Sequence, residues 1–154
     1  MATNRISPDD AHRLTMALGR TARRVRAVTS AGLSPSQLRC LASIVRDGPL
    51  RASQLANVDD INPTAVSRII GRLEDDGLIS RAADPADGRA CVLVATRKGR
   101  RLVEHVMADR IALLTERVGE LDPHDARALV AALPALEALA LRLAEDMPGA
   151  RADR

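Results

Sequence analysis

Small side chains followed by arginine mark the segment of this chain best suited to recognising another molecule. They stand at the start of an expected helix and comprise Pro63, Thr64, Ala65, Ser67 and Arg68. A helix of about 10 to 12 Å diameter fits the roughly 12 Å wide major groove of DNA, and small side chains at its start allow a close approach. Arg68 can then fork onto a guanine edge or a phosphate. In the alternative, Thr64 only supports the helix cap and Arg68 pairs with a surface acid. Arg72, one turn later, is expected either to contact a phosphate or to lie in solvent.

A loop between two apolar runs is the second candidate for recognition. An Asp-Gly turn signal at Asp87 separates the runs Leu78 to Ala82 and Cys91 to Ala95, which predict the two strands of a hairpin. Arg89 on such a tip can enter a minor groove, and Asp87 could orient it. Alternatively, the aspartates of the loop only satisfy turn amides and Arg89 is solvated. Arg81, on the first strand, either binds phosphate or braces the hairpin through a carboxylate.

Composition favours duplex DNA as the partner. The net charge of +3 and the isoelectric point near 9.6 fit a polyanionic partner, and nearly all of the positive charge is arginine. The chain has no Phe, Trp or Tyr. It therefore lacks the stacking platforms that readers of RNA and of single strands depend on.

No pattern in the sequence predicts an enzyme, a metal site or a cofactor. The three histidines, His12, His105 and His124, have no metal-ligand spacing. The chain also lacks a Gly-rich phosphate loop and a nucleophile motif. We therefore expect neither catalysis nor a cofactor.

Two features indicate the cytoplasm. Cys40 and Cys91 are too few and too far apart for a disulfide framework, which fits a reducing compartment. No apolar run reaches the roughly 18 residues that a membrane helix requires, and Met1 to Pro8 has no apolar export segment.

Capping residues divide the chain into six expected helices. Ser7, Ser34, Asn62, Thr96 and Asp122 stand where a short polar side chain caps a helix start. The expected helices run from Pro8 toward Gly32, Pro35 to Gly48, Ala52 to Asn57, Pro63 to Gly77, Thr96 to about Val118, and from Pro123 through Met147. A turn is expected over Val58 to Ile61, a kink or interruption at Pro134, and a disordered tail over residues 148–154.

The long fifth and sixth helices carry more apolar surface than one small domain can cover. The stripe of the fifth helix comprises Val103, Met107, Ile111, Leu114 and Val118, with Leu102 and Val106 beside it. The stripe of the sixth comprises Leu129, Leu133, Leu136, Ala140, Leu143 and Met147. The first helix would cover part of this surface, and something else must bury the rest.

The chain resembles the MarR (multiple antibiotic resistance regulator) family of winged helix-turn-helix transcription regulators. The matching segments, in order, are LSPSQL at 33–38, NPTAVSR at 62–68, LEDDGLI at 73–79, Arg81, DPADGR at 84–89 and ATRKG at 95–99. One position departs from the family pattern, because Gly88 stands where the family commonly has a basic residue. Minor-groove contact would then rest mainly on Arg89.

The resemblance implies a fold and an assembly. The fold is mainly α with a small β-hairpin wing, in a single domain over residues 1–154. Residues 34–99 would form the winged helix-turn-helix that binds DNA, and residues 1–33 and 100–147 would form dimerisation helices. Two subunits of the family interlock and place their recognition helices about one DNA turn, roughly 34 Å, apart, which implies a homodimer on a palindromic operator.

The resemblance also implies regulation. Members often bind small anionic or phenolic ligands between the dimerisation helices and the DNA-binding region, so we expect a repressor that an effector releases. Speculative ligand-binding residues are His12, Met16, Arg46 and His105. Cys40 stands where the family usually has an aliphatic side chain, which favours a buried structural thiol.

A second function remains open at this stage. The same fold could serve as a ligand-binding or redox-switch protein that lacks sequence-specific DNA binding. The intact wing and arginine set argue against it, and neither cysteine has a neighbourhood that would activate a thiolate.

Overall fold

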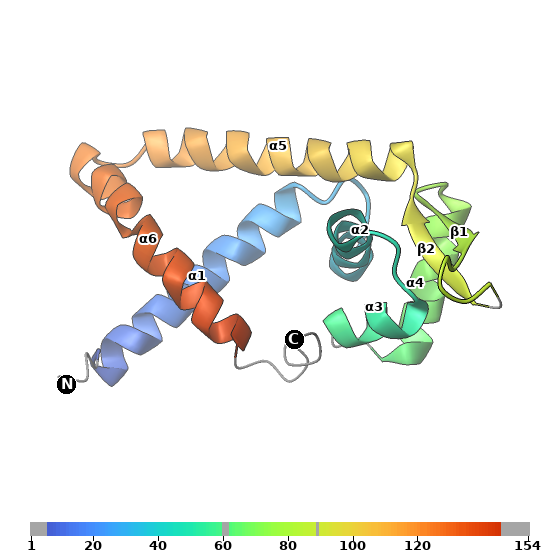
Figure 1. Cartoon of the computed structure of the whole chain (residues 1–154). Coiled ribbons are helices and arrows are strands. Elements are labelled where there is room, and N and C mark those ends of the chain that lie inside the picture. The colour runs from blue at the N-terminus through green and yellow to red at the C-terminus, as the bar shows by residue number, and fades with distance from the viewer. Residues whose placement is uncertain (1–5, 60–61, 89, 146–154) are drawn as a thin grey trace.

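The computed structural model describes residues 6–59, 62–88 and 90–145 of the chain (Figure 1). It is mainly helical with one two-stranded antiparallel sheet, which confirms the expected fold class. The elements are α1 (Pro8–Val28), α2 (Pro35–Asp47), α3 (Ala52–Asp59), α4 (Pro63–Asp75), β1 (Ile79–Ala83), β2 (Cys91–Ala95), α5 (Arg97–Gly119) and α6 (Pro123–Glu145). The tail over residues 148–154 lies outside the described residues.

The hydrophobic core belongs to one end of the molecule, which we call the head (residues 33–106). Leu41 and Ile44 of α2, Leu55 of α3, and Ile70 and Leu73 of α4 are almost fully buried there. The two strands and the first turns of α5 close the same core cluster, none of whose members lies outside residues 33–103. The head therefore buries its own core, and α4 is held in place by its apolar face.

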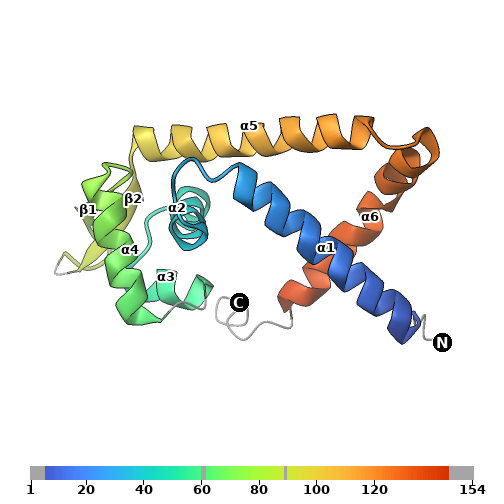
Figure 2. The ribbon, with the colours of Figure 1, turned by 180° about the vertical axis from the view of Figure 1, so that it is seen from behind.

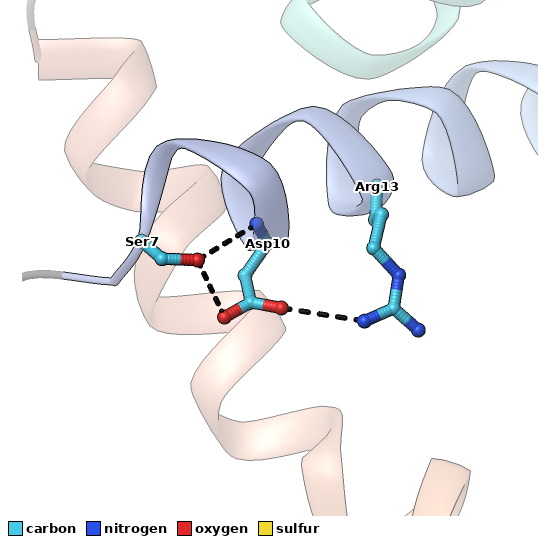
Figure 3. Close-up of polar contacts among 3 residues, drawn as sticks. All are labelled: Ser7, Asp10 and Arg13. Atoms are coloured by element: carbon cyan, nitrogen blue, oxygen red, sulfur yellow. Dashed lines mark hydrogen bonds and ion pairs between the residues drawn. The ribbon is translucent and has the colours of Figure 1, made fainter.

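Side-chain caps fix where the helices begin. Ser34 accepts a hydrogen bond from the Gln37 amide at 3.2 Å while its own amide donates to Gln37 Oε1 at 2.7 Å, a complete capping box. Figure 3 shows the start of α1, where Ser7 Oγ accepts from the Asp10 amide at 3.0 Å and donates to the Asp10 carboxylate. Arg13 donates to the other oxygen of that carboxylate. Local hydrogen bonds thus confirm these two expected helix starts.

The hairpin is anchored to the head by a third short segment. β1 pairs with β2 from Ile79 opposite Ala95 to Ala83 opposite Cys91. Leu50 forms an isolated bridge with Leu93 through two backbone hydrogen bonds of 2.8 and 3.2 Å. The wing is therefore tied to the residues that precede α3.

Some expected boundaries need correction. α3 continues through Val58 to Asp59, where we expected a turn, because no glycine or proline stops it there. β1 begins at Ile79 and α1 ends at Val28, well before Gly32. Pro134 does not interrupt α6: the helix continues to Glu145, although proline cannot donate the backbone hydrogen bond of its position. The alanine and leucine neighbours of Pro134 are among the best helix formers.

The remaining helices form extended arms (residues 8–28 and 107–145). α5 leaves the head as a long rod, α6 turns back from its far end, and α1 departs from beside α2 (Figures 1 and 2). α1 has no buried residue. Exposed large hydrophobic side chains among the described residues all lie on or beside these helices: Ile6, Met16, Leu18, Val28, Met107, Ile111, Leu114, Leu121, Leu129, Val130, Leu133, Leu139, Leu141 and Leu143. Part of the expected stripe is covered by the head, since Val106 is buried. No described helix combines the length and apolar character needed to cross a membrane.

Gly99 allows α5 to start against the chain that enters β1. A Cβ at this position would overlap the backbone carbonyl of Leu78, so the Gly99→Ala change must move backbone. We expect it to lower the free energy of unfolding by about 1 to 3 kcal/mol. Gly71→Ala is the matched control, because it adds a methyl inside α4 where no atom lies within 4 Å, and it should raise stability by about 0.5 to 1 kcal/mol. Urea unfolding followed by circular dichroism measures both, and equal effects would contradict this explanation.

Candidate nucleic-acid interface

The start of α4 presents its polar face to solvent. Thr64, Ser67 and Arg68 are exposed, and Ala65 is half-buried. The backbone of Pro63 occupies the first turn of the helix, and Asn62 Oδ1 caps it by accepting from the Thr64 amide at 2.9 Å. Arg68 has no ion-pair partner within the part of the chain that the structure describes. The geometry therefore leaves its guanidinium available to a ligand.

Two further arginines expected near DNA are held by acids. Arg81 of β1 donates to both carboxylate oxygens of Glu74 at 2.9 and 3.1 Å. This hydrogen bonding is the main reason that the pKa of Arg81 is raised above its ordinary value. Of its two expected roles, the structure contains the brace, which joins β1 to the end of α4. Arg72 Nε lies 3.6 Å from Asp76 Oδ2, and this exposed ion pair is of the weakest kind.

The wing loop is organised by Asp84. Asp84 Oδ1 accepts from the Ala86 amide at 2.8 Å, and Oδ2 accepts from Arg51 Nε at 2.7 Å. These bonds, that from Ala86 first, hold the pKa of Asp84 below its ordinary value. Such a carboxylate adds stability above its ordinary titration range and loses the contribution as pH falls through the folded pKa. Asp87 is exposed and closes the loop through its backbone, and Arg89 lies outside the described residues.

The four residues expected to bind a ligand do not meet in the single chain. His12 and Met16 line a shallow hollow on α1 together with Arg20. Arg46 is occupied by Asp47 through bonds of 2.8 and 2.7 Å at the end of α2. His105 lies elsewhere on α5, 3.5 Å from Asp109. Within one chain these residues occupy three separate places.

A hollow that the sequence analysis missed lies where the arms join the head. It has a volume of about 610 Å³ and four arginines in its wall, Arg23, Arg26, Arg39 and Arg110. Its other wall residues are Ser30, Leu33, Pro35, Leu38 and Ala42. We call it the arginine hollow. The three-residue spacing of Arg23 and Arg26, which places both on one helix face, was a signal for it.

One of these arginines is fixed to the chain that joins α1 and α2. Arg110 Nε donates to Thr29 Oγ1 at 3.1 Å, and Thr29 Oγ1 donates to the Val25 carbonyl at 2.7 Å. Thr29 is buried. Arg110 of α5 is thereby connected directly to the end of α1.

In the part of the chain that the structure describes, neither a metal site nor a disulfide accompanies these features. Among the described residues, no group of three His, Cys, Asp or Glu side chains could hold a metal ion. Cys40 is buried in the core of the head, as expected, and Cys91 is exposed at the start of β2.

The two cysteines should differ sharply in reactivity. Cys40 is 0% exposed, whereas Cys91 faces solvent. We expect one thiol per chain to react with Ellman's reagent in the native protein and a second only in denaturant. Absorbance of the released thiolate measures both stages, and Cys91→Ser should remove the first without the second. Rapid reaction of two thiols in the native state would contradict the buried position of Cys40.

Comparisons with known proteins agree on one family. A family model described as the MarR family matches residues 33–91. The chain is 31% identical over 110 residues to an uncharacterised HTH-type transcriptional regulator of Mycobacterium bovis, covering 71% of this chain and 77% of that protein. It is 36% identical over 83 residues, 54% of each chain, to the HTH-type transcriptional repressor MdtR of Bacillus subtilis. The crystal structure of the transcriptional regulator Tm0710 from Thermotoga maritima matches with a TM-score of 0.74 and 26% identity, covering 92% of this chain and 100% of that one.

Proposed function

Because the chain belongs to the MarR family of helix-turn-helix transcription regulators, we propose that it is a homodimeric repressor that binds a palindromic operator in double-stranded DNA. The observation that carries this proposal is the exposed start of α4, with Arg68 unpaired among the described residues, beside the wing. The relatives are named as HTH-type transcriptional regulators or repressors, which supports the proposal. Such a regulator meets chromosomal DNA in the cytoplasm.

The arms supply the second subunit's docking surface in this proposal. Their exposed apolar side chains, among them Ile111 at 60% and Leu143 at 61% exposure, have nothing to cover them in one chain. Burying apolar surface is the main driving force of association. A dimer through the arms would hold two heads about one DNA turn, roughly 34 Å, apart, as a palindrome requires.

Selection from a random duplex library tests DNA binding and identifies the operator sequence in the same experiment. The purified protein should enrich sequences with dyad symmetry, and its hydroxyl-radical footprint on the winning duplex should be two-fold symmetric. Light scattering at micromolar concentration should give the mass of a dimer. A monomer, or a library that shows no enrichment after several rounds, would contradict the proposal.

The arginine hollow is the proposed effector site. Four arginines from α1, α2 and α5 line it, and the chain has no Phe, Trp or Tyr to stack on a ring. This chemistry favours a compact anion with more than one negative charge over a phenolic monoanion. The hollow lies between the arms and α2 of the head, so an anion that binds one arrangement of head and arms more tightly would change the separation of the two heads.

An anion panel at constant ionic strength tests the effector site, since added salt alone weakens DNA binding. Citrate and inorganic phosphate should release the selected duplex at lower concentrations than benzoate. Arg26→Gln should raise the citrate concentration needed, and Arg127→Gln, which removes the same charge from α6, should not. Equal potency of all three anions, or an unchanged response in Arg26→Gln, would contradict this site.

A further inference from the structure

A second feature of the head connects the wing to the start of α3, the helix that packs against α4. Arg51 is the residue before α3, and Leu55 donates the first helical hydrogen bond to its carbonyl oxygen at 3.0 Å. The Arg51 amide is itself capped by Gln54 Oε1 at 2.8 Å. The Arg51 side chain reaches Asp84 of the wing through Nε at 2.7 Å and Nη2 at 2.6 Å. The start of the helix-turn-helix is thus joined to a loop 33 positions later in the sequence.

Both oxygens of the Asp84 carboxylate are used, and on different parts of the molecule. Oδ1 holds the Ala86 amide and so shapes the wing loop, while Oδ2 holds the guanidinium of Arg51. The side chain of Asp84 is only 9% exposed, and that of Arg51 is 45% exposed. A well-shielded, charge-assisted pair is more rigid than an exposed ion pair between two mobile side chains. One carboxylate therefore joins the wing loop to the residue that precedes α3.

On a DNA-binding face, electrostatic attraction to phosphate does not favour this pair. A carboxylate in the wing repels phosphates, and pairing it with Arg51 removes an arginine from DNA contact. This loss of attraction to DNA is explained if the pair sets the position of the wing. A wing and a helix that read the same duplex must keep a fixed separation, because small displacements lose contacts at one of the two grooves.

On the premise that the chain binds duplex DNA as proposed above, we propose that Arg51 and Asp84 are a positioning pair that fixes the wing relative to α4, so that both parts bind the operator together. Neither residue contacts DNA in this proposal. They act through the orientation of the loop.

The sign of one substitution separates this proposal from simple electrostatics. Asp84→Asn keeps an oxygen for the Ala86 amide and removes a negative charge, so charge alone predicts tighter DNA binding. A positioning role predicts the opposite, about tenfold weaker binding to the selected duplex. The hydroxyl-radical footprint should lose the flanking protection that the wing gives and keep the central protection that α4 gives.

Partner variants and matched controls complete the test. Arg51→Gln should weaken DNA binding to a similar degree, and Arg51→Lys should keep most of the wild-type affinity. The double variant Asp84→Asn/Arg51→Gln should bind no more weakly than the weaker of the two single variants, because the two residues act through one contact. Asp75→Asn and Arg97→Gln change the same charges at exposed positions of the head for which no ion pair is described, and should show only small effects. Circular dichroism spectra like that of the wild type, and melting temperatures that stay well above the assay temperature, separate positioning from loss of fold.

Two results would overturn the inference while the proposed function stands. In the first, the wild-type protein binds the selected duplex, and Asp84→Asn binds it as tightly or more tightly and keeps the flanking footprint. The other is additive losses in the double variant. If the wild-type protein selects no duplex at all, the proposed function itself is wrong.

Discussion

Leu133→Glu should convert the proposed dimer to a monomer and raise the dimer dissociation constant by about ten-thousandfold or more. An unpaired carboxylate buried in an interface costs about 3 kcal/mol or more, and a symmetric dimer carries the change twice. In the isolated chain Leu133 is 49% exposed, so the same change should leave the helical content unaltered. Light scattering measures the mass, and fluorescence anisotropy with a labelled duplex should show affinity for DNA falling at least about a hundredfold, since one head alone loses half of the contacts.

Ala138→Glu is the control on the same helix. At about 100° per residue, position 138 lies on the opposite side of α6 from Leu129 and near Arg127 and Arg142. This variant should remain a dimer with unchanged DNA affinity. If both variants stay dimeric, the apolar stripe of α6 is not the interface. If both become monomers, the interface covers the whole circumference of the helix.

Arg68→Ala should weaken binding to the selected duplex by about 1 to 3 kcal/mol, a factor of roughly 5 to 150. The reason is the position of Arg68 on the exposed face of α4, without an ion pair among the described residues that DNA would first have to break. Binding to a random duplex should fall much less, because a base contact matters only on the correct sequence. Anisotropy titrations with the two duplexes give the ratio directly.

Arg72→Ala provides the comparison, since its side chain lies one turn further along α4 and is paired only loosely with Asp76. If it contacts phosphate, its loss should weaken both duplexes equally and reduce the salt dependence of binding by about one unit of slope. Equal losses on both duplexes for Arg68→Ala would assign it to phosphate and remove it from base recognition. No loss at all would place it outside the interface.

The sequence predicted helix starts closely because their cause is local. Ser7, Ser34, Asn62 and Thr96 each accept a hydrogen bond from an amide two or three residues later, so the signal lies within a few neighbouring positions. Helix ends and the effect of Pro134 were less predictable. There the outcome depends on how strongly the flanking residues favour a helix, which no single residue reports.

Contacts between distant segments could not be predicted. The arginine hollow gathers side chains from three helices, and only the spacing of Arg23 and Arg26 is visible in the sequence. The pair of Arg51 and Asp84 is likewise a product of the hairpin folding back onto the start of α3. That the loop aspartates only satisfy turn amides was one of two alternatives. Asp84 bonds a turn amide with one oxygen, while its other oxygen accepts from Arg51, a residue that sequence analysis did not single out.

The separation between a self-contained head and arms without buried core has a consequence for how such proteins diverge. Every member of the core cluster lies within residues 33–103, so the core of the head does not include any residue of α6. If α6 forms the dimer interface as proposed, a few substitutions on its surface after gene duplication would stop two sister regulators from exchanging subunits while the head of each stays folded. The two regulators would then no longer form mixed dimers, and the stability of the head would change little.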